Sequence, residues 1–549
     1  MKRKLSALMS AAILVASLGA CSGSASSAPA ASSAAPASSA APAASSSAAP
    51  ASSAAPAEPE VPTLPLAETL DLEGMIYIRD TDTIKVDADL WWVKKSFEAT
   101  NININWNQTN ASDWATQINL MFASGEYPDI IMDGDSSGII SSEIYGVDQG
   151  ILRPVDDLLQ YTPNYTEIYD QDTSGKLALT KSDGKTYAWG SYADYVYGLS
   201  NHFFINKIWR DKLGLENPKT AEELYTVMQA FRTQDPNGNG DPTDEIVYEG
   251  IFDELTTHFF FLFGIPEDSK HYSINDEGKV IFDPFLPGYR EAITYMANMY
   301  ADGLMDPATI TQDANSKISM YNQNNCGIVT AHRLRAMGWD PLLDTMEFLM
   351  TPAAEGYTVK QNSSFGLPDE RIFITSTNEH PIETALWVNY QFETQSIWDS
   401  YYGPQGMIWD WVDGKCEIVS GNDQGVMEYA LGVNGAYYLP SFYYNTVFKQ
   451  PDYRQERIDY IDQYLAAGFA EKYPTSYIKL GKQSVEQTTE IATLFANIET
   501  LYDQLVADMI MSGVTDDKWN NFITQLTAAG AERYCEIYQE ILDTVELPA

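Results

Sequence analysis

The chain has 549 residues, and its formal net charge of −43 comes from 76 acidic and 33 basic side chains. Nucleic acids and anionic membrane surfaces select proteins with a basic face, so this balance argues against both as partners. Acidic polysaccharides are disfavoured as well, unless a local basic pocket is present. Hydrophobic residues make up 44% of the chain, enough for a large core, and two lobes are expected at this length.

The first twenty residues are typical of a secretory leader. A positive start, MKRK, precedes an apolar stretch at residues 5–18 that is too short for a stable membrane span. The leader ends in Leu-Gly-Ala before Cys21, which resembles a lipobox. We therefore predict a lipoprotein signal peptide at residues 1–20, with Cys21 as the lipidated residue. An ordinary cleavage site with an incidental cysteine is the alternative.

Residues 21–66 hold the lipidated cysteine and then a tract of alanine, serine and proline. This composition has almost no apolar surface to bury, so we expect a disordered linker. A flexible chain of this length spans roughly 35–40 Å r.m.s.. The folded domain, residues 67–549, is then expected on the extracellular face of the cell membrane, held only by the lipid.

From residue 70 onward, strand-like and helix-like segments alternate. The order is a strand over 74–78, a helix over 88–100, a half-buried strand over 101–107, a helix over 112–124 and a buried strand over 129–132. Ser112 is the expected N-cap of the second helix, and Gly125 its stop. This βαβ order predicts a mostly parallel sheet flanked by helices.

Two stretches carry side chains that suit a sugar ligand. The last of these strands runs into a polar loop at Asp133, and ligands of open α/β sheets sit at the carboxyl ends of strands. Aromatic residues crowd between 185 and 206, and Trp189, Tyr195 and Tyr197 are candidates to stack on the apolar face of a sugar ring. Packing in the core or at a hinge is the alternative for these aromatics.

The segment DPNGNGDPTDE, residues 235–245, is the sharpest local motif. It offers oxygens from one tight loop, which is what a hard cation such as calcium requires. Glycine at the sixth place permits a sharp turn, but the closing glutamate stands at the eleventh place instead of the twelfth. The predicted ligands of a structural calcium are Asp235, Asn237, Asn239, Asp241 through its carbonyl, Asp244 and Glu245. An ion-free Asn/Gly turn is the alternative.

Metalloprotease and nucleotide-binding motifs are missing from the sequence. It contains no H-E-x-x-H and no P-loop, and its five histidines have no metal-ligand spacing. Beyond Cys21, the three remaining cysteines have neither metal nor redox spacing, so one disulfide and three free thiols both remain open. We predict no catalytic residue and no catalytic cofactor.

Several segments resemble, in their order along the chain, the extracellular solute-binding proteins of ABC transporters. They resemble in particular the large lipoprotein-type oligosaccharide binders of Gram-positive bacteria. The segments are ASGEYPDIIM, FINKIWRDKLGL, DPNGNG, YREAITYMANMYADGLMDP and GPQGMIWDW. The resemblance extends from residue 70 to the end, and some members of the family hold calcium in the DPNGNG loop.

The resemblance implies a two-lobe, type II periplasmic-binding-protein fold with a mostly parallel sheet in each lobe. Lobe 1 would comprise about 70–190 and 355–420, and lobe 2 about 200–350 and 425–549. His332 and Arg333, after a strand over 325–330, would face the cleft, although a solvated pair is an equal alternative. Trp409 and Trp411 would be stacking platforms.

The implied function is capture of a carbohydrate, an oligosaccharide in this branch, by a monomer that closes two lobes around it. The closed form would dock on a two-subunit ABC permease, and no bond would be broken. A secreted glycoside-active enzyme and a binder of peptide or another solute are the alternatives. A surface adhesin fits the anchor but not the order of the segments.

Overall fold

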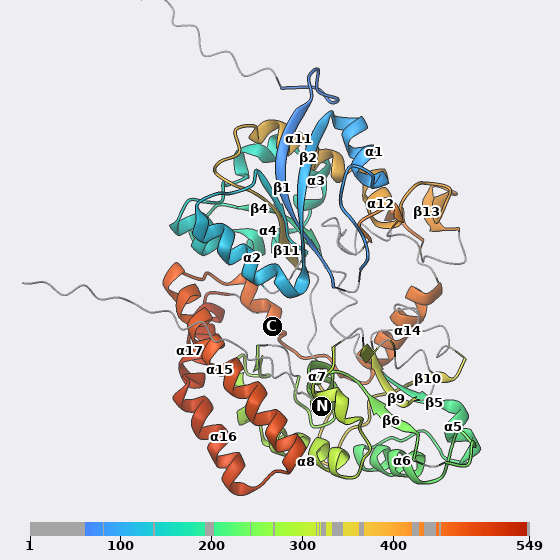
Figure 1. The fold of residues 1–549 in the computed structure, drawn as a ribbon. Helices are drawn as coiled ribbons and strands as arrows, with labels where there is room; N and C mark the ends of the chain where they lie inside the picture. The colour runs from blue at the N-terminus through green and yellow to red at the C-terminus, as the bar shows by residue number, and fades with distance from the viewer. Residues whose placement is uncertain are drawn as a thin grey trace, which may run out of the picture. The chain divides into compact units, whose positions relative to one another are not determined.

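The computed structural model describes residues 61–545, except 81, 135–137, 193–201, 242, 267–269, 314–315, 318, 320–325, 332–343, 362–366, 420–427, 433–445 and 450–451. Residues 61–549 form one compact unit. Two larger sheets lie in this unit, each with helices on its faces (Figure 1). In the described part of the chain, no helix is long and apolar enough to cross a membrane.

The first sheet contains five described strands in the order β2-β1-β3-β11-β4. The strands are β1 (Leu70–Ile78), β2 (Ile102–Asn110), β3 (Ile130–Met132), β4 (Ala188–Tyr192) and β11 (Pro368–Ile374). Strand β1 pairs in parallel with β2 and β3, whereas β11 is antiparallel to both β3 and β4. The strand that separates β3 from β4 thus comes from far along the chain.

Alternation along the strands gives this sheet a core on each face. Ile130 and Met132 belong to one buried cluster, and Ile131 between them belongs to the other, as expected where successive side chains point to opposite faces. The helical segments that accompany this sheet are α1 (Trp91–Thr100), α2 (Ala111–Ser124), η1 (Glu143–Asp148), η2 (Asp156–Tyr161), α3 (Pro163–Tyr169), α4 (Thr173–Leu179), α11 (Pro381–Gln391) and α12 (Thr394–Tyr402).

Helix α2 ends as the sequence predicts but begins one residue earlier. Gly125 takes the left-handed conformation at its end, with φ of 77°. The N-cap position is Asn110, not Ser112, and its side chain makes no capping bond. The carboxylate of Asp80 accepts hydrogen bonds from the amide and the hydroxyl of Ser112, at 3.1 and 3.0 Å. A side chain from the loop after β1 therefore satisfies the helix end.

The second sheet contains four described strands in the order β10-β5-β9-β6. They are β5 (His202–Asn206), β6 (Ile246–Glu249), β9 (Cys326–Ala331) and β10 (Met346–Leu349). Strand β5 is antiparallel to β9 and β10, and β6 and β9 are parallel. Two smaller hairpins pair β7 (Tyr272–Ile274) with β8 (Val280–Phe282), and β12 (Trp409–Val412) with β13 (Lys415–Ile418).

The described strands of both sheets run mostly in one direction, as predicted, but each sheet is mixed. One strand in each sheet, β11 in the first and β5 in the second, runs against all the others. Each of these strands enters its sheet directly after the chain has crossed from the other sheet. It therefore begins at the edge where its neighbours end.

A large buried cluster covers one face of the second sheet, including Phe203 and Ile205, and Phe204 lies in a smaller cluster on the other face. The associated helical segments are α5 (Lys207–Lys212), α6 (Ala221–Thr233), α7 (Phe252–Phe261), η4 (Asp283–Phe285), α8 (Pro287–Ala301), η5 (Pro307–Ile310), α14 (Asp452–Ala466), η9 (Thr475–Leu480), α15 (Val485–Ser512), α16 (Asp516–Ala528) and α17 (Ala531–Leu542). Cys326, Cys416 and Cys535 are free thiols.

We use "first lobe" for residues 61–192 and 367–449, and "second lobe" for 202–361 and 452–545. The chain returns from the second lobe to the first after residue 361. Before that point, main-chain hydrogen bonds from Ala354 to Leu262 and from Gln361 to Phe469 hold it in the second lobe. Lys449 likewise bonds to Cys416 of the first lobe. The chain thus crosses to the first lobe after residue 361 and back to the second lobe after residue 449, whereas the predicted positions were near 355 and 425.

Candidate functional site

The ends of the strands locate a candidate site at one edge of each sheet. In the first sheet, β1, β2, β3 and β4 all end at the edge where β11 begins, and in the second sheet β6, β9 and β10 end where β5 begins. Residues 193–201 link Tyr192 to His202, so the chain itself joins these two edges. Ligands of α/β folds bind at such edges, because polar loops follow the strands there.

At the edge of the first sheet, Asp133 directly follows β3, as predicted. Its amide donates to the carbonyl of Arg371 at 2.8 Å, and only 3% of the residue is exposed. The next residue, Gly134, lies against Tyr77, whose ring would be 2.3 Å from an added Cβ. The Tyr77 ring in turn meets Trp114 edge-to-face at 5.5 Å. The loop after β3 is therefore closely packed at its start.

Arg371 holds this loop from β11. The register of β11 against β4 shifts between Glu370 and Ile372, and such a bulge redirects a side chain. The Arg371 guanidinium donates to the carbonyl of Asp133 at 3.1 Å and lies 3.7 Å from the carboxylate of Asp369. Asp369 also pairs with Lys479 of η9. Three contacts thus form a chain from Lys479 of the second lobe to the loop after β3.

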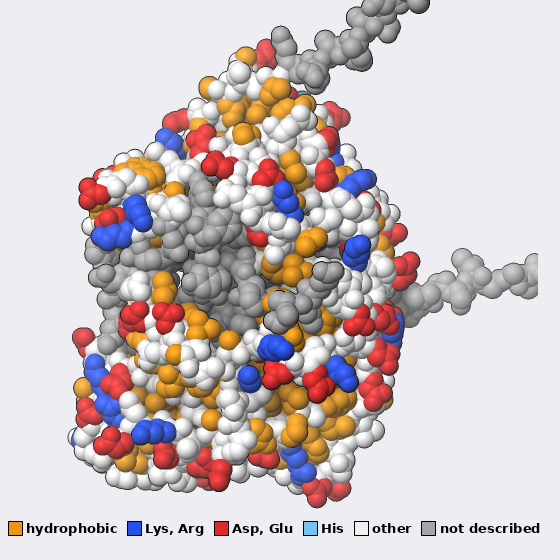
Figure 2. All heavy atoms as spheres, turned by 180° about the vertical axis from the view of Figure 1, so that it is seen from behind, with side chains coloured by type: hydrophobic (Ala, Val, Ile, Leu, Met, Phe, Trp, Pro, Cys, Tyr) orange, Lys and Arg blue, Asp and Glu red, His pale blue; other side chains and the backbone are white. Residues whose placement is uncertain are grey.

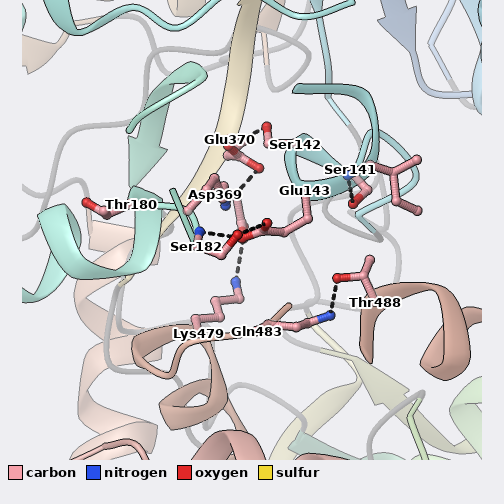
Figure 3. A network of polar contacts seen from close by, with 12 residues as sticks. Ser141, Ser142, Glu143, Thr180, Ser182, Asp369, Glu370, Lys479, Gln483 and Thr488 are labelled. Carbon is pink, nitrogen blue, oxygen red and sulfur yellow. Dashed lines mark hydrogen bonds and ion pairs between the residues drawn. The ribbon is translucent and has the colours of Figure 1, made fainter. Parts of the chain in front are cut away.

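A second set of polar contacts connects η1 and the turn before β4 to the start of β11 (Figure 3). Glu370 accepts from the Ser142 hydroxyl at 2.8 Å and pairs with Lys181 at 3.1 Å. Glu143 accepts from the amide and the hydroxyl of Ser182, at 2.8 and 2.7 Å. These bonds tie η1 and the turn before β4 to the start of β11. Several hydrogen bonds and an ion pair thus hold this edge of the first sheet in place.

At the edge of the second sheet, Glu249 ends β6 with a fully buried side chain. Its carboxylate accepts a hydrogen bond from Gln312. Burial raises the pKa of Glu249 to about 7, and the nearby Asp306 adds to the rise. This carboxyl group therefore changes its charge near neutral pH.

A buried ion pair lies beside Glu249. Lys317, which is 1% exposed, pairs with Glu254 at the start of α7. Burial raises the pKa of Glu254 and lowers the pKa of His258 to about 4. The His258 ring bonds through Nδ1 to the carbonyl of Glu254 at 2.6 Å, which suits a neutral imidazole that donates there.

Two of the predicted stacking residues lie in the core in this structure. Trp189 has no exposed surface, and its indole nitrogen points to the hydroxyl of Thr162 at 3.4 Å. Trp409 also has no exposed surface, and its nitrogen donates to the carbonyl of Gly403 at 2.8 Å. Neither ring presents a face to a ligand here, because each is packed in a buried hydrophobic cluster beneath its strand.

Trp411 differs from these two, since 39% of it is exposed. It stands two residues after Trp409 on the same strand and meets that indole edge-to-face at 6.3 Å. Beside it, Asp410 accepts from the Gln405 amide at 2.7 Å. An exposed indole next to an amide and a carboxylate suits a sugar, so Trp411 stays a candidate.

The other predicted contact residues lie outside the described part of the chain. They are Tyr195, Tyr197, His332 and Arg333, together with the lipidation residue Cys21 and the tract that follows it. The strand before His332 is present as β9, which ends at Ala331.

The predicted calcium loop connects α6 to β6. Asp235 accepts from the amides of Gly238 and Gly240, at 2.9 and 3.0 Å. The side-chain amides of Asn237 and Asn239 both bond to the carboxylate of Asp244. The sixth residue, Gly240, has φ of 92°, a conformation that favours glycine. The oxygen atoms of Asp235 and Asp244 thus accept hydrogen bonds from within the loop itself.

Glu245 is the residue of this loop that most needs a partner. It is 5% exposed, and neither carboxylate oxygen accepts a well-oriented hydrogen bond from a described residue. Burial raises the pKa of Glu245, and the charges of Asp244 and Asp235 add to the rise. Asp241, by contrast, is exposed and accepts from Thr243. A buried carboxylate without a donor fits a cation, although no described cluster of three His, Cys, Asp or Glu side chains has metal-ligand spacing.

Sequence reasoning missed Asp369, Arg371, Lys479 and Glu249 as site residues. Each is an ordinary charged residue in a strand or turn, and its place follows only from strand pairing across long separations. On the face drawn in Figure 2, the coloured acidic and basic side chains are interspersed, with hydrophobic ones between them. Surface charge on this face thus marks no single site.

The two hairpin tryptophans differ in burial, so their truncation should lower stability by different amounts. Trp409→Ala should lower the free energy of unfolding by about 3–5 kcal/mol, because it empties a core position. Trp411→Ala should lower it by less than about 1 kcal/mol. Urea denaturation followed by circular dichroism measures both, and equal losses would contradict the burial of Trp409.

The raised pKa of Glu249 predicts a pH dependence of stability. Between its ordinary pKa and about 7, the folded protein binds more protons at this group than the unfolded chain does, so its contribution falls as pH rises. Glu249→Gln should remove a loss of about 2–3 kcal/mol between about pH 5 and 7.5. Urea denaturation across this range tests it. Glu277→Gln, in an exposed turn, is the control and should leave the slope unchanged.

Comparison with known proteins agrees with this architecture. Residues 81–341 match the family described as bacterial extracellular solute-binding protein. The chain is 27% identical over 466 residues to the fructooligosaccharide ABC transporter substrate-binding protein FusA of Streptococcus pneumoniae, which covers 81% of this chain and 85% of FusA.

Solved structures of FusA give the same result. FusA in complex with kestose superposes with a TM-score of 0.74 at 25% identity, covering 86% of this chain and 99% of that one. A FusA EF-hand mutant in complex with fructo-nystose gives a TM-score of 0.74 at 24% identity, with the same coverage. The family match, the similarity to FusA over most of both chains and the two mixed sheets show that the chain has the two-lobe type II fold and is similar to bacterial extracellular solute-binding proteins.

Proposed function

We propose that this protein captures a neutral oligosaccharide between its two lobes and delivers it, unmodified, to an ABC importer. Fructooligosaccharides are the first class to consider. The observation that carries the proposal is the similarity to FusA over most of both chains, including FusA in complex with kestose. The chain crossing from Tyr192 to His202 supports it, since it joins the two edges at which a ligand would be held.

The charges at these edges favour an uncharged ligand. The described cations there already have carboxylate partners: Lys181 pairs with Glu370, Arg371 lies beside Asp369, and Lys317 pairs with Glu254. An anionic sugar would have to compete with these carboxylates. Hydroxyl groups, by contrast, need neutral hydrogen-bond donors and acceptors and no free cation.

The membrane anchor and the permease belong to the same proposal. Cys21 and the Ala/Ser/Pro tract provide, by sequence, a lipid attachment and a flexible connection. The folded residues 67–549 would then sample the membrane surface around the importer. Closure on the ligand would present one defined shape to the permease, because a ligand that bridges both lobes shifts their open–closed equilibrium.

We further propose that the loop of residues 235–245 binds a structural calcium ion. Asp235, Asn237, Asn239, Asp244 and Glu245 would hold it with oxygen atoms, and the Asp241 carbonyl is a further candidate. The carboxylate of Glu245 supports this, because it is buried and accepts no well-oriented hydrogen bond from a described residue, as does the description of a related structure as a FusA EF-hand mutant. The ion would stabilise the junction between α6 and β6.

Titration of the leader-free protein tests the ligand. Intrinsic tryptophan fluorescence and calorimetry with 1-kestose or nystose should show saturable binding with a Kd of about 1 µM or lower. The sugar should be recovered intact by chromatography, because the proposal includes no bond cleavage. Galacturonate oligomers and short peptides serve as comparison ligands. Binding to these alone, or conversion of the sugar, would contradict the proposal.

Removal of calcium should lower the melting temperature. The chelator-stripped protein should regain its stability on addition of CaCl2, and calorimetry should show one binding event. Glu245→Gln should weaken calcium binding at least about tenfold, because it removes the charge of a ligand. Glu277→Gln removes the same charge from an exposed turn and should have no effect. Absence of calcium heat in the stripped protein would exclude the site.

A further inference from the structure

An ion pair joins the two lobes beside the second chain crossing. Lys479 of η9 pairs with Asp369, the second residue of β11 (Figure 3). The neighbours of Lys479, Tyr477 and Ile478, are part of the large core of the second lobe. Ile372 and Ile374 on β11 belong to the core of the first lobe. Each partner of the pair is therefore anchored in a different core.

The pair continues on the first-lobe side as a chain of polar contacts. The other oxygen of Asp369 lies 3.7 Å from Arg371, and Arg371 donates to the carbonyl of Asp133 at 3.1 Å. The side chains of Asp369 and Arg371 are 16% and 13% exposed. Such shielded charges are screened less than surface pairs. The position of η9 can thus influence the loop after β3.

We propose that Lys479, Asp369 and Arg371 are positioning residues that couple the placement of the second lobe to the ligand-facing loop at Asp133. Arg371 holds the loop directly, and Lys479 acts through Asp369. This inference rests on the proposed function for its effect on sugar affinity. Its structural part needs no ligand.

The surrounding groups support this assignment. Alternate residues on β11 point to opposite faces, so Glu370 turns away and binds Ser142 and Lys181 inside the first lobe. Among the described residues, the ion pair between Asp369 and Lys479 is thus the contact that joins this part of β11 to the other lobe.

Hydrogen exchange measured by mass spectrometry on the ligand-free protein tests the coupling. The amide of Asp133 donates to the carbonyl of Arg371 at 2.8 Å, so peptides that contain residues 131–134 report on the loop. Lys479→Met should speed exchange in these peptides about threefold or more, and Arg371→Met should do so as well. Lys479→Arg keeps a positive charge beside Asp369 and leaves the contact of Asp369 with Arg371 in place, so it should retain slow exchange.

Arg290→Met is the matched control. It breaks the pair of Arg290 with Asp516 at 2.6 Å inside the second lobe, and Arg290 is 40% exposed against 39% for Lys479. It should leave residues 131–134 unchanged. If Lys479→Met alters exchange only around η9, or Lys479→Arg speeds exchange in the loop as much as Lys479→Met does, the coupling is wrong.

Binding of 1-kestose gives the functional readout. Lys479→Met should raise the Kd about two- to fivefold, whereas Lys479→Arg should leave it close to that of the unsubstituted protein. An unchanged Kd despite faster loop exchange would contradict the role in affinity. If the unsubstituted protein binds no sugar, the proposed function fails, and the exchange measurements still decide whether the lobes are coupled.

Discussion

Strand β11 is the element on which the rest of the first lobe depends. It pairs with β3 on one side and with β4 on the other, so the sheet is continuous only when this late segment is inserted. Its direction follows from its route: it enters from the second lobe and must start at the edge where the other strands finish. That same entry places Asp369, Glu370 and Arg371 where the ligand loops begin.

The electrostatics of the edges follow from the composition. The chain has more than twice as many acidic as basic side chains, and the described cations Lys181, Lys317, Arg371 and Lys479 near these edges each lie beside a carboxylate. The result is a set of charges that hold loops in place instead of a basic surface that attracts an anion. Buried carboxyl groups such as Glu249 and Glu254 have raised pKa values, so the same region also limits its own negative charge.

Much of the fold could be predicted from local pattern. The alternation around Ile131, the stop at Gly125 and Pro381 at the first turn of α11 follow from periodicity and backbone chemistry, and the structure confirms them. The direction of β5 and β11 could not be predicted, because it depends on which lobe the chain has just left. Local sequence also could not separate Trp409 from Trp411, since only the partner strand and the helix behind it decide which indole is buried.

The site was predictable as a location but only partly as a set of side chains. Asp133 lies where a strand end predicts it. In the 235–245 loop Asn237 and Asn239 both bond to Asp244, but no described cluster of three His, Cys, Asp or Glu side chains has metal-ligand spacing. Arg371 owes its role to a bulge and to a carbonyl on a distant strand, neither of which leaves a local signal. The fit of Glu245 to a cation likewise depends on burial, which its position in the loop did not show.

The insertion of β11 also has a consequence for how the protein is made. Because synthesis proceeds from the amino terminus, β3 and β4 emerge well before β11 does. Until then their facing edges carry unpaired main-chain groups, and exposed strand edges invite pairing with other chains. The first lobe therefore cannot complete its sheet until residues beyond 374 are available, although most of its sequence comes first. Folding of the earlier half has to wait for the later one.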